Sequence, residues 1–139
     1  MGSTLILGYD GSDCAKAALH TAVEAAQAYG DRIVVAFGAG VYPIGEDSDH
    51  ERLLRERGTG LADEALAAIR AAGVSECEAA VVDARPAEAL LRVAADRGAR
   101  MIVVGTQGEH PLTGAVLGSV PHKLLHLSQV PVLVVPVGA

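Results

Sequence analysis

The chain is poor in the residues on which most nucleic-acid-binding proteins rely. Among its 139 residues there is no tryptophan, one phenylalanine and three tyrosines, so it has little with which to stack bases. Its 11 Lys and Arg are outnumbered by 17 Asp and Glu, which gives a net charge of −6. Because a phosphate backbone is bound through clustered basic side chains, we expect no nucleic-acid partner.

Cysteine and long apolar runs are also scarce. Cys14 and Cys77 are too few for a disulfide scaffold and lack the spacing of a zinc site, so we expect both to be reduced thiols. Residues 1–4 carry no basic n-region of a signal peptide. The longest apolar run, residues 130–137, is far too short to span a membrane. These absences together predict a cytoplasmic protein that makes no membrane contact.

What the chain does have is apolar runs that alternate with helical patterns. The predicted strands are residues 4–9, 32–38, 76–82, 100–104 and 130–135. The first predicted helix is capped by Ser12 or Asp13 and stops at Gly30, and the others are residues 50–72, 86–97 and 119–127. Such alternation predicts an α/β fold, a mostly parallel sheet with helices on both faces, in a single domain of residues 1–139. Gly58 and Gly60 fall inside the second helical pattern, and we expect them to kink it or delay its start.

A glycine-rich stretch after the fourth apolar run is the most informative part of the chain. Gly105 follows that run directly, Gly108 comes three residues later, and Gly118 and Ser119 follow after nine more. Pro121 is tolerated in the first turn of a helix but not in its interior, so the last helix should begin near Ser119. Glycines allow close approach of the backbone, and a helix N-terminus offers free N–H groups. This combination predicts an anion site, with phosphate as the expected anion, although the glycines could also serve the loop alone.

A second loop is expected at the same edge of the sheet. Asp10, Gly11 and Ser12 follow the first apolar run. Parallel sheets bind ligands at the carboxyl ends of their strands, where the strand order reverses. If the first and fourth strands are neighbours, Asp10 faces the glycine loop. Two interpretations of Asp10 remain open: a turn residue, or a carboxylate that accepts hydrogen bonds from ribose or base or holds a metal.

Several other site types do not fit the sequence. It has no Gly-Lys-Ser/Thr phosphate loop, and the first strand is not followed by a dinucleotide-binding glycine motif. A phospho-accepting receiver domain would need a lysine where Val135 and Pro136 stand. His122 and His126 share a helix face but lack a third ligand, so we predict no metal ligand set. No arrangement of nucleophile and base is evident, and we predict no catalytic residue. His122 and Lys123 can add positive charge near the phosphate.

With these loops in place, the sequence resembles the universal stress protein family, in its ATP-binding branch. The resemblance is carried by residues 6–12, by Gly105-x-x-Gly108-x9-Gly118-Ser119 with Val120, and by residues 130–136, and it covers nearly the whole chain. It implies a Rossmann-like, five-stranded parallel sheet in the order 3-2-1-4-5. It also implies ATP as the ligand, in many members together with a divalent metal such as Mg²⁺ or Mn²⁺.

The resemblance also implies roles for individual residues. Asp10, with Gly11, would contact the nucleoside, and Phe37 or Gly38 would line the adenine pocket. Ribose and phosphates would be cradled by Gly105, Thr106, Gly108, Gly118, Ser119 and the backbone of Val120. The last strand, from Val130 to Val135, would pair with its copy in a homodimer, which would cover an apolar edge otherwise prone to aggregation.

The chain departs from the family pattern within the glycine loop. Gln107 and Glu109 stand where many members carry a histidine and a basic residue. Since Glu109 brings a negative charge toward the triphosphate, we expect affinity to rest on backbone N–H groups and a metal. The resulting hypothesis is an ATP-binding stress-response or signalling protein, a dimeric switch with slow hydrolysis at most. The alternatives are a dimeric interaction module that needs no nucleotide, and an enzyme of adenylyl or phosphoryl transfer.

Overall fold

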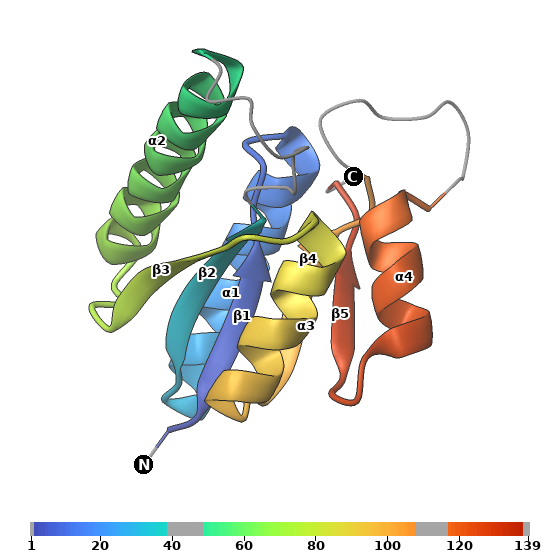
Figure 1. Ribbon diagram of the computed structural model, residues 1–139. Coiled ribbons are helices and arrows are strands. Elements are labelled where there is room, and N and C mark those ends of the chain that lie inside the picture. The colour runs from blue at the N-terminus through green and yellow to red at the C-terminus, as the bar shows by residue number, and fades with distance from the viewer. Residues whose placement is uncertain (1, 39–48, 108–116, 138–139) are drawn as a thin grey trace.

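Five parallel strands form a single sheet, as the sequence predicts. The computed structural model describes residues 2–38, 49–107 and 117–137, and the side chains within these ranges except those of residues 49–55. The elements are β1 (Thr4–Gly8), α1 (Asp13–Tyr29), β2 (Arg32–Gly38), α2 (Asp49–Ala71), β3 (Cys77–Val82), α3 (Pro86–Arg97), β4 (Met101–Gly105), α4 (Ser119–Leu127) and β5 (Val132–Val135). The strand order is β3-β2-β1-β4-β5, and every pairing is parallel (Figure 1).

The helices cover both faces of the sheet, with α1 and α3 on opposite sides (Figure 1). Successive side chains of a strand point to opposite faces. Leu5 and Leu7 of β1 therefore pack with residues of α1 and α2, whereas Ile6 packs with residues of α3 and α4. Within the described residues, none of the helices has both the length and the apolar character needed to cross a membrane.

Local sequence signals set most of the helix ends. The Ser12 hydroxyl accepts a hydrogen bond from the Ala15 N–H at 3.1 Å and caps α1, which ends at Gly30 in the left-handed region. Pro86 opens α3. The last helix, α4, begins at Ser119 and holds Pro121 in its first turn, so the position inferred from this proline is confirmed.

Several predicted boundaries differ from the structure by one or two residues, and those of α2 and β5 have an evident cause or consequence. The second helix, α2, begins at Asp49 and runs through both Gly58 and Gly60, so the glycines do not delay its start. At the other end of the chain, β5 begins at Val132 and not at Val130. The Ser128 hydroxyl donates to the Val130 carbonyl at 2.7 Å and accepts from its N–H at 3.1 Å, which holds Val130 in a turn.

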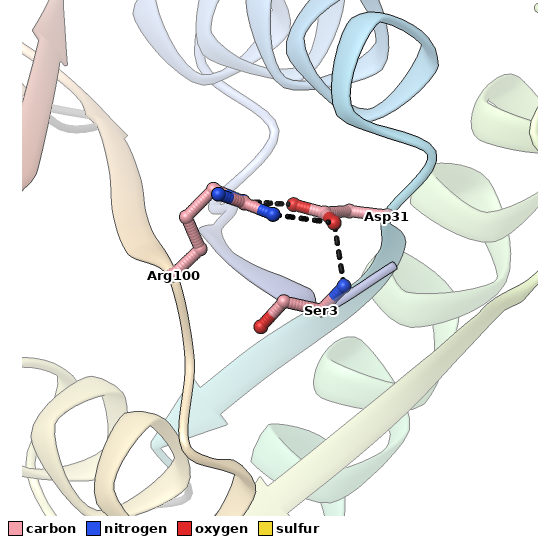
Figure 2. Close-up of polar contacts among 3 residues, drawn as sticks. All are labelled: Ser3, Asp31 and Arg100. Carbon is pink, nitrogen blue, oxygen red and sulfur yellow. Dashed lines mark hydrogen bonds and ion pairs between the residues drawn. The ribbon is translucent and has the colours of Figure 1, made fainter. Parts of the chain in front are cut away.

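A buried carboxylate joins the amino-terminal ends of three strands (Figure 2). Asp31 precedes β2, and its side chain has no exposed surface. It accepts hydrogen bonds from Arg100 Nε at 2.6 Å and from the Ser3 N–H at 2.6 Å. The Arg100 guanidinium also lies over the Tyr29 ring, 4.2 Å from its centroid. These contacts hold the residue before β4 and the residue before β1 to the start of β2.

The pKa of Asp31 follows from these contacts. Burial alone would raise the pKa of this carboxyl, because a charged group loses hydration there. The hydrogen bonds from Arg100 and from the Ser3 amide, together with the Arg100 charge, outweigh burial and lower the pKa below its ordinary value. The folded state therefore favours the ionised carboxylate.

We predict that the variant Asp31→Asn is less stable than the wild type by about 2 kcal/mol at pH 7, because it leaves Arg100 without its charged partner. A lowered folded-state pKa stabilises the protein above the unfolded pKa of about 4, and this stabilisation fades as the pH falls below that value. Urea unfolding should therefore show a smaller difference between the variant and the wild type at pH 3 than at pH 7. Asp63→Asn, at an exposed position of α2, is the matched control. An equal loss at both pH values would contradict a charge effect.

Candidate functional site at the carboxyl edge of the sheet

The loops predicted to form the site lie at one edge of the sheet. The central strand, β1, pairs with both β2 and β4, with Leu7 in register with Val35 and with Val103. Since all three strands are parallel, the segments that follow them leave from the same edge. The predicted adjacency of the loops after the first and fourth strands is therefore confirmed.

Asp10 closes a turn directly after β1. Its Oδ1 accepts a hydrogen bond from the Ser12 N–H at 2.9 Å. Gly11, between them, has a φ of 83°, which a residue with a side chain rarely adopts. A Cβ at Gly11 would also lie 2.9 Å from Cδ2 of Leu61 in α2. The turn interpretation of Asp10 therefore holds for one carboxylate oxygen, while Oδ2 makes no hydrogen bond to a described residue.

Tyr9 links this turn to α2. Its hydroxyl donates to Oε2 of Glu64 at 3.0 Å. Burial, the hydrogen bond to Glu64, and the charges of Glu64 and Asp10 raise the pKa of Tyr9 to about 12. The phenol therefore stays protonated, and its hydrogen bond to Glu64 holds α2 close to the turn at Asp10.

Phe37 and Gly38 occupy different surroundings at the end of β2. The Phe37 ring is buried in the hydrophobic cluster beneath α1 and α2. Gly38 lies where the turn between β3 and α3 crosses β2. A Cβ there would lie 2.5 Å from the Ala84 carbonyl oxygen and 2.8 Å from the carbonyl carbon of Arg85. Gly38 therefore offers only backbone groups at this edge, and its lack of a side chain lets Arg85 pass.

Gly105 is required by close packing against α1. A Cβ at Gly105 would lie 2.7 Å from both the carbonyl carbon and the Cβ of Cys14, in the first turn of that helix. The next residue continues the contact, since Thr106 Oγ1 lies 3.6 Å from Cys14 Sγ. The Thr106 N–H donates to the Val135 carbonyl at 3.2 Å. The end of β4 is thus held between α1 and β5.

The start of α4 lies against the segment that leaves β4. The Gly118 N–H donates to the Thr106 carbonyl at 2.8 Å. A Cβ at Gly118 would lie 3.2 Å from that oxygen and 3.2 Å from Cα of Gln107. Gly118 has a φ of −64°, so the close approach, and not the backbone conformation, favours glycine. Ser119 and Val120 follow as the first residues of α4. Of the predicted residues, Gly108 lies outside the described part of the chain, as does Glu109.

A groove of about 260 Å³ opens between the N-terminal ends of α3 and α4. It is lined by Arg85, Pro86, Ala87, Glu88, Ser119, Val120 and Lys123. Both helices direct free backbone N–H groups toward their N-terminal ends, where a helix dipole favours negative charge. Ser119 and Val120 are predicted site residues, whereas the four residues from α3 and the turn before it were missed. The sequence signal that could have identified them is the turn after the third strand. A parallel third strand ends at the same edge of the sheet as the first and fourth strands.

No metal site is evident in the part of the chain that the structure describes. Those residues contain no group of three or more His, Cys, Asp or Glu side chains that could hold an ion. His122 and His126 lie edge to face, with ring centroids 4.7 Å apart, but both are exposed and form only a pair. Cys14 and Cys77 are free thiols, as predicted.

Relatives of the chain share one family description. The model of the Universal stress protein family matches residues 1–136. A universal stress protein of Thermus aquaticus is 38% identical over 139 residues, which cover 97% of this chain and 99% of the relative. Another, of Mycobacterium tuberculosis, is 29% identical over 141 residues, with 95% and 94% covered.

Solved structures are similar over almost their whole length. A universal stress protein in complex with cAMP superimposes with a TM-score of 0.77 at 29% identity, and 98% of each chain is covered. A universal stress protein of Archaeoglobus fulgidus in complex with dAMP has a TM-score of 0.72 at 21% identity, with 97% and 98% covered. The latter identity supports the likeness of fold alone.

We predict that Gly105→Ala lowers the free energy of unfolding by about 1–3 kcal/mol, because the new methyl group must displace the first turn of α1. Gly60→Ala is the matched control. No atom lies within 4 Å of a Cβ at that position in α2, and alanine should there stabilise the protein by up to about 1 kcal/mol. Urea unfolding of both variants measures the difference. A Gly105→Ala variant as stable as Gly60→Ala would contradict the packing constraint.

Proposed function

The chain belongs to the universal stress protein family, and we propose that it is an ATP-binding stress-response or signalling protein of the cytoplasm, acting as a dimeric switch. The observation that carries the proposal is the hydrogen bond of 2.8 Å from the Gly118 N–H to the Thr106 carbonyl. It sets the N-terminus of α4 beside the exit of β4, as a phosphate site between them requires. The similar structure that holds cAMP adds support for an adenine nucleotide.

The described residues fit the parts of a nucleotide. Asp10 retains one carboxylate oxygen for a ribose hydroxyl, beside Gly11, and Gly38 presents backbone to the base, with the buried Phe37 behind it. The phosphates would meet the β4 exit at Gly105 and Thr106 and the α4 start at Gly118, Ser119 and Val120. Gly108 would complete this cradle.

A divalent ion such as Mg²⁺ or Mn²⁺ would be held chiefly by phosphate oxygens and water, as Mg²⁺ commonly is at nucleotides. The described residues offer no metal cluster of their own that would hold it without the nucleotide. Bound ATP would supply a triphosphate whose presence or loss switches the protein between two states. Any hydrolysis of the bound ATP would be slow.

We predict micromolar binding of ATP, which needs about −8 kcal/mol. Four charge-assisted backbone hydrogen bonds, at about 1.5–3 kcal/mol each, can supply it. Gly118→Val should weaken binding at least tenfold, because its methyl groups would meet the Thr106 carbonyl. Gly60→Val, placed in open space on α2, is the control. Calorimetric titration measures the affinity, and circular dichroism checks that both variants fold.

Absence of ATP binding by the wild type at millimolar concentration would overturn the nucleotide proposal. If the protein were then still dimeric, the interaction module that needs no nucleotide would be the better description.

The dimer would form at the outer edge of β5. This strand ends the sheet, and among the described strands only β4 pairs with it. The Pro131 carbonyl, just before β5, accepts from Ile102 of β4, and the Val135 carbonyl accepts from Thr106, just after β4. The other edge of β5 therefore keeps backbone groups available. Leu133 is 38% exposed on this strand. An unpaired apolar edge is an aggregation hazard that pairing with a second copy removes.

We predict that Leu133→Glu converts the dimer to a monomer at micromolar concentration, because like charges would face each other across the paired strands. Leu125→Glu is the control, since Leu125 is 54% exposed on α4 and lies off the strand. Light scattering coupled to size exclusion gives the mass of each form. A wild-type monomer, or a Leu133→Glu dimer, would contradict pairing through β5.

A further inference from the structure

The groove between α3 and α4 carries a local charge opposite to that of the whole chain. Arg85 and Lys123 line it, and Glu88 is the acidic residue among its lining side chains. The chain as a whole has a net charge of −6. The positive ends of two helix dipoles add to the cations of the groove. An anion that is repelled by most of this protein would therefore be attracted here.

We propose that Arg85 and Lys123 bind the phosphate groups of the nucleotide and make the site prefer ligands that carry these charged groups. This inference rests on the proposed nucleotide binding and assigns the part of the site that the glycines do not supply. It concerns two exposed side chains, which act by direct contact with the ligand.

The backbone holds Arg85 in a defined place. It is the cap residue of α3, with φ −70° and ψ 157°, and its side chain makes no capping hydrogen bond. The carbonyl carbon of Arg85 would lie only 2.8 Å from a Cβ at Gly38, so this turn is packed tightly over the end of β2. A guanidinium has a planar set of donors that matches two phosphate oxygens at once. The backbone of Arg85 is thus held in place by packing, while its side chain can reach a ligand.

Lys123 lies one helical turn after Ser119 and therefore on the same face of α4. Two other arginines among the described residues are paired: Arg97 with Glu78, and Arg100 with Asp31. Arg85 and Lys123, in contrast, form no salt bridge with any described residue.

This lack of pairing extends to the acid in the groove. Glu88 lies three residues after Arg85, yet the two side chains do not form an ion pair. Both cations of the groove therefore retain their donors for a ligand.

The groove is large enough for part of a nucleotide, but small for a complete one. Its volume of about 260 Å³ lies below the range of about 300–1,000 Å³ that is typical of sites for complete small molecules. Asp10 and Gly38 do not line it, and neither do Gly105, Thr106 and Gly118, so the groove adjoins the proposed phosphate cradle at Ser119 and Val120. The base and ribose would thus extend toward Asp10 and Gly38, and the phosphates would occupy the groove beside Ser119.

The test compares ligands that differ in charge. Calorimetric titrations of adenosine, cAMP, AMP and ATP are made with the wild type, Arg85→Gln, Lys123→Gln and the double variant. We expect each single variant to lower ATP affinity about tenfold, since a charge-assisted hydrogen bond is lost. Adenosine affinity should change less than twofold, and the effect on AMP should lie between the two.

Three further variants separate charge from structure. Glu88→Gln should raise ATP affinity, because it removes a negative charge from the groove. Lys123→Arg should retain most of the wild-type affinity. Arg92→Gln, at an exposed arginine of α3 that does not line the groove, is the matched control and should leave every affinity unchanged.

Each outcome supports or overturns the assignment. If the double variant binds ATP as tightly as the wild type, the inference is wrong, while nucleotide binding stands. If the double variant loses adenosine and ATP equally, the two residues act on the fold and the inference is also wrong. If the wild type binds none of the four ligands, the proposed function fails, and this assignment fails with it.

Discussion

The absence of a side chain at position 105 is the constraint on which the carboxyl edge of the sheet depends. The last residue of β4 lies so close to Cys14 that even a methyl group would overlap the first turn of α1. Because of this approach, Thr106 leaves the sheet between α1 and β5, and its carbonyl is in position to accept from Gly118. The place where α4 begins therefore follows from how closely a strand and a helix on the far side of the sheet can pack.

Sequence periodicity was sufficient to predict the α/β architecture, whereas the strand order followed only from the family resemblance. The apolar runs are long enough to mark buried parallel strands, and Pro121 restricted the start of α4 to the position observed. The reason for Gly105 was not predictable in the same way. A glycine near a ligand and a glycine beneath a helix look alike in a sequence, and only the contact with Cys14 distinguishes them.

Features that join distant parts of the chain were also missed. Asp31 and Arg100 show no mutual signal in the sequence, because they meet only when β1 and its two neighbours pair. Arg85 was passed over because its turn holds no glycine motif, although it follows a strand as Asp10 does. The predicted residues thus lie in the loops of distinctive composition. The groove adds the turn at Arg85, which the fold brings beside Ser119 although its composition is ordinary.

The crossing at Gly38 has a consequence for how such a site can evolve. The turn that carries Arg85 rests on the end of a strand that lies much earlier in the chain, and the two touch through backbone atoms. Any side chain gained at position 38 would displace the turn that carries Arg85, although residue 85 itself would still be an arginine. Lineages that retain a positive charge at position 85 should therefore retain glycine at position 38, and the two positions would be inherited together although their side chains never meet.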